Sequence, residues 1–190
     1  MKHVLKPALS LFIIAAITTC LLALAHSLTL EPIANQVKKT QEKAMKTIIP
    51  SASGFREIQT EKTGNIDRVF ESYSGNETLG IIVELSPGGY SGDINMMVGI
   101  LKAENKIAGM RILKHSETPG LGALAVKEKF FRKYDNRKLV PLRVTRSSPG
   151  ENEIEAITGA TITTKAITDA VNEAIEWHNT HYNNRGAALP

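Results

Sequence analysis

Residues 66–114 read "IDRVFESYSGNETLGIIVELSPGGYSGDINMMVGILKAENKIAGMRILK", and this stretch decides the fold. It contains a series of short apolar runs punctuated by Gly, Pro and Ser, at 66–73, 78–86, 94–102 and 107–114. Runs of this length between turn residues are typical of β-strands. Only "AENK" joins the last two runs, so we expect these strands to form an antiparallel meander.

Helical patterns follow the strands. Apolar residues recur at three- and four-residue spacing in a predicted helix over 163–178, at Ile167, Ala170, Val171, Ala174 and Ile175. The segment "ALAVKEKFFRKY" (123–134) has a helical spacing through Val126, Phe130 and Phe131. Strands followed by helices predict an α+β fold, with one twisted and mainly antiparallel sheet flanked by helices.

The N-terminus contains a long apolar segment. Between Lys6 and Glu31 there is no Asp, Glu, Lys or Arg, which gives a run long enough to cross a bilayer. A cleaved signal sequence is the alternative, but the run exceeds the usual apolar region of such signals, so retention is favoured. We therefore predict a transmembrane anchor over 1–30. A helical stalk over 31–50 would follow it, with Pro32 near its first turn and Pro50 as its stop.

Composition limits the possible functions. The 190 residues carry a formal net charge of +4, one Trp and one Cys, and Cys20 lies inside the apolar segment. These numbers exclude a disulfide framework and a cysteine-based metal site outside the anchor. No basic stripe interleaved with aromatic residues is present, so no nucleic-acid partner is expected. The remaining chain is divided into one domain over 51–180 and a polar tail over 181–190.

The segment "ITGATITTKAIT" (157–168) places five threonines around a Gly-Ala pair, directly before the last predicted helix. Helix capping by Thr161 or Thr163 is the simpler interpretation. One threonine is enough for a cap, however, and Gly159 and Ala160 allow another group to approach the backbone closely. Because a helix N-terminus attracts anions, a bound phosphate is the second interpretation.

A second unusual segment is "HSETPGLGA" (115–123). His115 and Glu117 suggest acid–base or metal chemistry, but they lack partners at a known ligand spacing. The loop makes better sense as shape, because Pro119 fixes it while Gly120 and Gly122 permit close approach of a flat ligand. An ordinary turn uses the same residue types and remains open as an alternative.

The Gly-rich connection "SPGGYSGDINMMVGI" (86–100) adds an aromatic face at Tyr90, although a plain turn explains its composition equally well. The common hydrolase, P-loop, zincin and dinucleotide-binding motifs are missing from the sequence. No self-sufficient catalytic site and no metal site is located. The Gly-containing turns together suit a flat cofactor pocket with polar edges.

The H-x-E-T-P-G-L-G loop, followed by "TGATITT" before the last helix, resembles the FMN-binding domain of the RnfG/RsxG subunit of the Rnf electron transport complex. It is also similar to that subunit's relative NqrC, from the sodium-pumping NADH:quinone oxidoreductase. The resemblance includes the N-terminal anchor and the "GGYSGDINMMVGI" strand, and so covers nearly the whole chain.

This resemblance implies that FMN is joined by a phosphoester bond to Thr161, the last threonine of the S/T-G-A-T motif. An ApbE-type flavin transferase would attach it outside the cytoplasm, with FAD as the donor. Family members commonly carry Asp six residues before this threonine, where the present chain has Glu155. The further cofactor-binding residues that the resemblance and the turn composition indicate are Thr158, Gly159, Ala160, Thr163, Thr164, Glu117, Thr118, Gly120, Leu121 and Gly122.

The implied function is electron transfer by a single-pass subunit of the bacterial inner membrane, with its FMN domain on the periplasmic side and the other Rnf subunits as partners. An NqrC-type subunit and a membrane-tethered assembly subunit without a redox role are the alternatives. A threonine-nucleophile hydrolase is a further alternative, for which His115 is the available base.

Overall fold

The computed structural model describes residues 2–59 and 62–182, and the chain divides into two compact units, Met1–Gln41 and Glu42–Pro190. Most of the predicted polar tail, residues 183–190, lies outside the described residues. Helix α1 (Lys2–Ile48) runs through the first unit and ends in the second. Its end before Pro50 is as predicted, but the separate stalk helix was wrong, since α1 continues through Pro32. Proline removes one backbone donor, and a long helix tolerates that loss.

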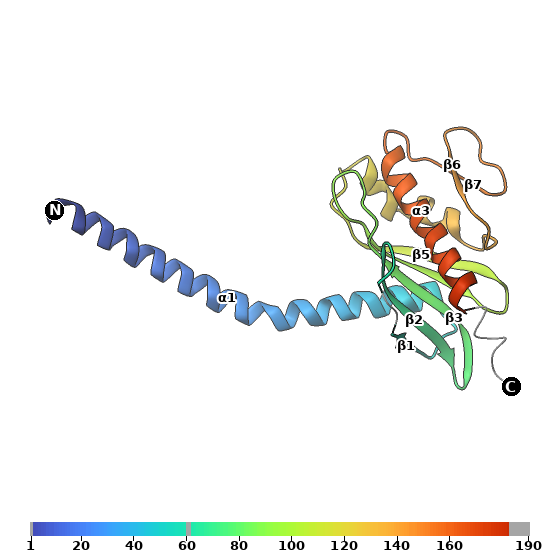
Figure 1. The fold of residues 1–190 in the computed structure, drawn as a ribbon, viewed down its shortest axis with the longest axis horizontal. Coiled ribbons are helices and arrows are strands. Elements are labelled where there is room, and N and C mark those ends of the chain that lie inside the picture. Colours follow the sequence, from blue (N-terminus) through green and yellow to red (C-terminus); the bar gives the residue numbers. More distant parts are fainter. Residues whose placement is uncertain (1, 60–61, 183–190) are drawn as a thin grey trace. The chain divides into compact units, whose positions relative to one another are not determined.

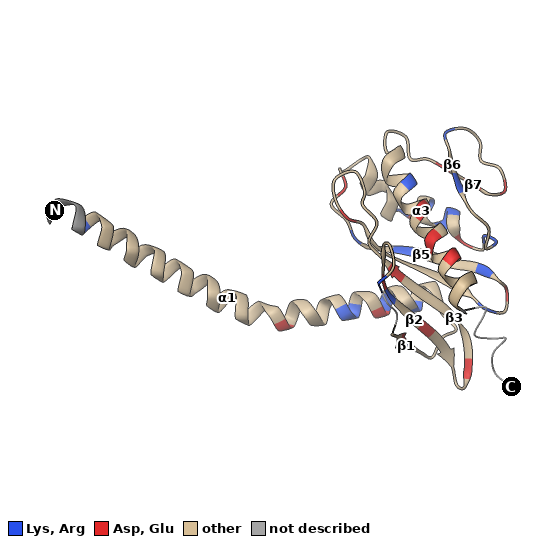
Figure 2. Ribbon diagram, viewed as in Figure 1, with Lys and Arg blue, Asp and Glu red and all other residues tan. Residues whose placement is uncertain are grey.

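The N-terminal part of α1 has the composition of a membrane span. Figure 2 shows that this part of the ribbon carries no charged residue between Lys6 and Glu31. By length and hydropathy the helix is apolar enough to cross a membrane. Its large apolar side chains are exposed, Leu22 by 71% and Phe12 by 69%, as expected for a helix whose solvent is lipid.

The second unit is built on a five-stranded antiparallel sheet, in the order β1-β2-β3-β4-β5 (Figure 1). The strands are β1 (Gly54–Ile58), β2 (Ile66–Ser74), β3 (Glu77–Leu85), β4 (Asn95–Leu101) and β5 (Lys106–Lys114). The predicted meander is confirmed, with each of its four strands placed within about a residue of the prediction. Strand β1 was missed because "GFREI" is short and only half-buried.

Each face of the sheet is covered by a different helix. Alternate residues of β3 point to opposite faces, as in any strand. Ile81, Val83 and Leu85 join the larger core beneath α3 (Thr161–Trp177), which lies over this face in Figure 1. Ile82 packs instead with the last turns of α1, through Ala44, Met45 and Ile48. The end of the predicted stalk is thus part of the folded domain.

The connection from β5 to the last helix is less regular than predicted. The helix expected over 123–134 was wrong, because this segment forms three short pieces, η1 (Gly122–Val126), α2 (Glu128–Phe131) and η2 (Arg132–Tyr134). Lys127 is extended at the break, with φ −78° and ψ 143°. Val126 is exposed whereas Phe130 is buried, so their helical spacing does not mark one buried face.

A parallel pair, β6 (Arg143–Thr145) and β7 (Glu153–Glu155), leads into α3 and was not predicted. Helix α3 begins two residues before the predicted start and is followed by η3 (His178–Tyr182). Its buried face contains all five of the residues that predicted it: Ile167, Ala170, Val171, Ala174 and Ile175.

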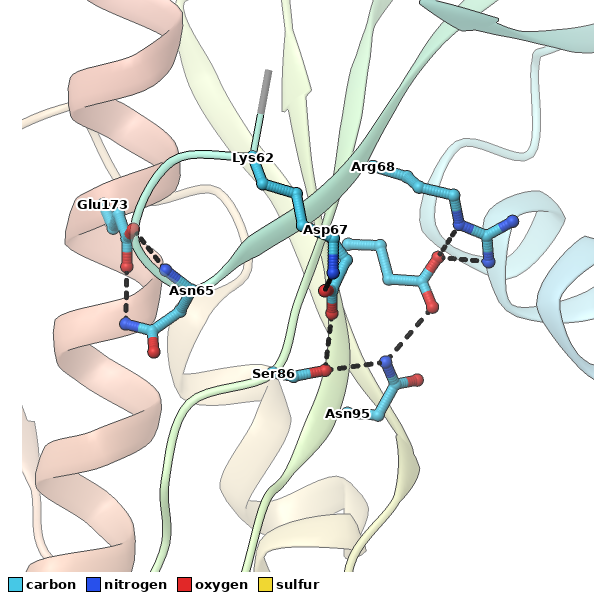
Figure 3. Close-up of polar contacts among 8 residues, drawn as sticks. Lys62, Asn65, Asp67, Arg68, Ser86, Asn95 and Glu173 are labelled. Carbon is cyan, nitrogen blue, oxygen red and sulfur yellow. Dashed lines mark hydrogen bonds and ion pairs between the residues drawn. The ribbon is translucent and has the colours of Figure 1, made fainter. Parts of the chain in front are cut away.

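A polar network fixes the bases of the Gly-rich loop between β3 and β4 (Figure 3). Asn95, at the start of β4, donates from Nδ2 to Oε1 of Glu84 (3.1 Å) and to the hydroxyl of Ser86 (3.2 Å), beyond the end of β3. Ser86 in turn donates to Oδ2 of Asp67 (2.6 Å). Buried Glu84 is also paired with Arg68 at 2.7 Å. The two ends of residues 87–94 are thereby held together at one edge of the sheet.

Candidate functional site

An open cavity of about 640 Å³ lies where α3 begins. Its wall is the continuous segment 155–163, which runs from the end of β7 into the first turn of α3. The other lining residues come from the loop after β5, from the Gly-rich loop and from the loop after β6; they are Glu117, Thr118, Leu121, Gly122, Tyr90 and Arg146. Three loops and one helix terminus therefore meet around one space.

The first turn of α3 has no side-chain cap. Ala160 occupies the N-cap position, with φ −133° and ψ 47°, and no side chain caps the helix. The prediction that Thr161 or Thr163 caps it was therefore wrong: both are already helical. Within the described part of the chain, the amides of residues 161–163 donate to no acceptor, and the first intrahelical bond runs from Thr164 to Ala160. These amides can satisfy an anion in the cavity.

Thr161 is the first residue of α3, and it lines the cavity while half-buried. Its hydroxyl has no hydrogen-bond partner among the described residues, unlike those of Thr163, Thr164 and Thr168. A hydroxyl that is both accessible and unengaged at a helix N-terminus is suited to react with, or hold, a phosphate group.

The turn before Thr161 is held by the backbone and by one buried threonine. Ala160 donates to the carbonyl of Ile157 (2.9 Å), and Gly159 adopts a left-handed conformation with φ +78°. The hydroxyl of Thr164 accepts from the amide of Ile157 (3.1 Å) and donates to the carbonyl of Ala160 (3.0 Å). The predicted cofactor contact by Thr164 is not supported, because this side chain is fully buried beneath the cavity and shapes the turn.

Glu117 links the three parts of the site. Its Oε1 accepts from the amides of Tyr90 (2.8 Å) and Ser91 (3.0 Å) in the Gly-rich loop. Its Oε2 accepts from the hydroxyl of Thr163 in the first turn of α3 (2.6 Å). The side chain is buried, at 6% exposed, so these hydrogen bonds replace its hydration.

The charge of Glu117 is stabilised by those donors. Burial raises the pKa of this carboxyl, but hydrogen bonds from Thr163, Ser91 and Tyr90 and the nearby His115 outweigh burial, so the pKa lies below its ordinary value of 4.5. Glu117 is therefore a carboxylate at neutral pH. It is a positioning residue, since all the contacts described are to the loops that surround the cavity.

Two glycines make room for Glu117. A Cβ atom at Gly122 would collide with Oε2 of Glu117 and approach the hydroxyl of Thr163 to 2.7 Å, and one at Gly89 would collide with Oε1. At Gly120 a Cβ would meet no atom within 4 Å, although φ is +79°. Gly120 does not line the cavity, so its predicted role in close approach is not supported. Gly122 is the residue of this loop whose small size matters sterically.

The structure thus brings most of the predicted residues to one cavity and adds two that were missed. Those that line it as predicted are Thr161, Thr158, Gly159, Ala160, Thr163, Glu117, Thr118, Leu121 and Gly122. Tyr90, noted only as an aromatic face in a turn, lines the cavity and is 70% exposed. Arg146 was missed because it lies in an irregular segment with no motif. It makes no ion pair within the described residues, and so offers a cation to a phosphate.

The geometry offers little to the other chemistries. His115 does not line the cavity, and its Nδ1 accepts from the amide of Glu117 at 3.2 Å. This leaves Thr161 without a histidine base at hand. No group of three or more His, Cys, Asp or Glu suited to a metal ion occurs among residues 2–59 and 62–182. Glu155 lines the cavity and pairs with Lys133 at 2.9 Å.

Comparisons with known proteins identify the family. Residues 89–176 match the FMN-binding domain family, and residues 1–48 match the RnfG N-terminal region. The chain is 36% identical to the RnfG subunit of the Na⁺-translocating ferredoxin:NAD⁺ oxidoreductase complex of Acetobacterium woodii, over 92% of this chain and 91% of that protein. The chain belongs to the RnfG family. The predicted resemblance is confirmed.

A second relative supports the same assignment. The corresponding subunit of the ion-translocating oxidoreductase complex of Methanosarcina acetivorans is 29% identical over 93% of this chain and 95% of that protein. Among solved structures, the NqrC-type subunit of the Na⁺-translocating NADH-quinone reductase of Parabacteroides distasonis has a TM-score of 0.58, at 17% identity. That similarity covers 78% of this chain and 94% of the other, and it confirms the α+β fold of this RnfG family member.

Proposed function

We propose that this RnfG family member is the membrane-anchored flavoprotein subunit of an ion-translocating electron transport complex, with FMN attached to Thr161 through a phosphoester bond. The observation that carries the proposal is the unengaged hydroxyl of Thr161, on an uncapped helix N-terminus that opens into the cavity. The match of residues 89–176 to the FMN-binding domain family supports FMN as the ligand.

The residues of the chain suit the two ends of such a cofactor. The amides of residues 161–163 and the guanidinium of Arg146 would hold the phosphate, and Thr158 lies on the same wall. Tyr90 and Leu121 offer apolar surface to a flat ring system. When bound, the flavin supplies one- and two-electron redox chemistry, and the protein supplies its position.

Attachment requires a second protein. Thr161 has no base beside it, so a flavin transferase of the ApbE type would activate the hydroxyl and present FAD. The oxygen of Thr161 would form a bond to phosphorus while the pyrophosphate bond breaks. AMP would leave, and the hydroxyl proton would pass to the transferase. Glu155, six residues before Thr161, stands where the family commonly has Asp and lies on the cavity wall within reach of such an enzyme.

Co-expression with a flavin transferase tests this proposal. We expect in-gel flavin fluorescence after denaturation in the wild type and in Thr161→Ser, and none in Thr161→Ala. Thr158→Ala is the matched control, because Thr158 lies on the same wall but outside the helix, and it should keep its flavin. Fluorescence that persists in Thr161→Ala and disappears in Thr158→Ala would reassign the attachment site.

We further propose that the FMN domain faces the periplasm, because the short segment before the apolar span is expected to stay in the cytoplasm. Lys102→Cys in a Cys20→Ser background gives a single exposed thiol in the folded domain. A membrane-impermeant maleimide should label it in intact spheroplasts. Labelling only after lysis would put the domain in the cytoplasm.

A further inference from the structure

A second cavity, of about 300 Å³, lies behind the wall of the first. Residues 155–158 line both cavities, so a single stretch of chain separates them. The remaining lining of the second cavity comes from the short helical pieces after β5: Leu124, Lys127, Lys129, Phe130 and Lys133. None of these residues is used by the proposed attachment of FMN.

This second cavity carries an excess of positive charge. Three lysines line it against one carboxylate, Glu155, which is already paired with Lys133 at 2.9 Å. The neighbouring Glu128 is paired with Arg132 on the same turn. Lys127 and Lys129 are exposed and make no ion pair within 4.0 Å in the described part of the chain. Their charges are therefore available to an anionic partner.

Apolar side chains adjoin these lysines. Leu124 and Val126 lie on η1 and are each 38% exposed, and Leu121, on the rim of the first cavity, is 43% exposed. We define the lysine face as Leu124, Val126, Lys127, Lys129 and Lys133. Apolar residues beside unpaired charges, on a surface next to a ligand cavity, are typical of a protein–protein contact.

We propose that the lysine face docks a redox protein through an acidic surface, with a carboxylate of that protein entering the second cavity. The inference rests on the proposed function. Charge complementarity of this kind mainly raises the association rate of short-lived complexes. Docking here would bring the partner's redox centre next to the flavin cavity, whereas a lipid surface on the same face would separate the flavin from electron carriers by hydrocarbon.

Charge reversal in the intact, purified complex tests the docking. Lys127→Glu/Lys129→Glu should leave the covalent flavin content unchanged by in-gel fluorescence. Electron transfer between the flavin and its protein partner, followed by stopped-flow flavin absorbance, should slow by about tenfold at low salt, and the difference should shrink at high salt. Lys102→Glu is the matched control, because this exposed lysine follows β4 at the opposite end of the sheet.

Zero-length carbodiimide crosslinking gives the second readout. In the intact complex we expect Lys127 or Lys129 to be linked to an Asp or Glu of another protein. The proposal is overturned if the double variant transfers electrons as fast as wild type. It is also overturned if its defect appears in vesicles containing phosphatidylglycerol and not in phosphatidylcholine alone, which would make lipid the partner. Loss of flavin from the wild type would instead contradict the proposed function.

Discussion

The hydroxyl of Thr163 donates a 2.6 Å hydrogen bond to Oε2 of Glu117, two residues that are 46 positions apart in the sequence. This bond joins the first turn of α3 to the loop after β5. Through the other carboxylate oxygen, the Gly-rich loop is held as well. The shape of the cavity thus depends on one buried carboxylate, which makes Glu117 the first residue to test.

Glu117→Ala should lower the free energy of unfolding by about 2–3 kcal/mol, because it leaves buried donors of the three contacts without an acceptor. Denaturant unfolding of the full chain in detergent measures this change. Glu176→Ala is the control: this carboxylate is exposed on α3, and its loss should cost less than about 0.5 kcal/mol. Equal effects of the two variants would show that Glu117 does not organise the site.

The same carboxylate should make stability depend on acidity. Since the pKa of Glu117 is lowered in the folded state, its contribution is present above its ordinary value of 4.5 and is lost as the pH falls through the folded pKa. Glu117→Gln keeps an acceptor oxygen without the titration. The thermal midpoint of the wild type should therefore fall more than that of Glu117→Gln between about pH 6 and about pH 3. Parallel curves would contradict this assignment.

Gly122→Ala and Gly120→Ala should differ in kind. At Gly122 the new methyl group would displace Glu117 and Thr163, so we expect a loss of about 1–3 kcal/mol together with reduced flavin attachment. At Gly120 the methyl group meets open space, and only the left-handed backbone costs about 1 kcal/mol, with attachment unchanged. Thermal unfolding and in-gel fluorescence separate the two effects. Greater loss of attachment in Gly120→Ala would show that the wrong glycine has been singled out.

Arg146→Ala should weaken the hold on the phosphate. In the Thr161→Ala background, where FMN binds only non-covalently, the dissociation constant should rise about two- to fivefold, as expected for an exposed charge pair. Fluorescence titration with FMN measures it. Arg143→Ala is the control, because this exposed arginine lies in β6 but does not line the cavity. The same rise with riboflavin, which lacks the phosphate, would count against a phosphate contact.

The sequence predicted the elements whose pattern is repeated or bounded by turn residues. The meander of β2 to β5 and the buried face of α3 are such cases, because alternation and three- to four-residue spacing report burial directly. The pieces around Lys127 were mispredicted because a local extended residue, which spacing does not reveal, divides them. Strands β6 and β7 are three residues long and gain their meaning only from pairing with each other.

The candidate site divides in the same way. The T-G-A-T turn and the loop after β5 were found from composition and from resemblance. The hub formed by Glu117 was not, because its partners Tyr90 and Thr163 are brought together only by the fold. Arg146 gave no signal in the sequence, since a single arginine in an irregular segment is ordinary.

The location of the flavin tests the central claim most directly. Tryptic digestion of the native protein should yield the peptide of residues 147–165, which contains Thr158, Thr161, Thr163 and Thr164. Tandem mass spectrometry should find the mass of FMN less water on this peptide, with fragment ions that assign it to Thr161. An unmodified peptide from flavin-containing protein, or fragment ions that assign the flavin to another residue, would contradict the claim.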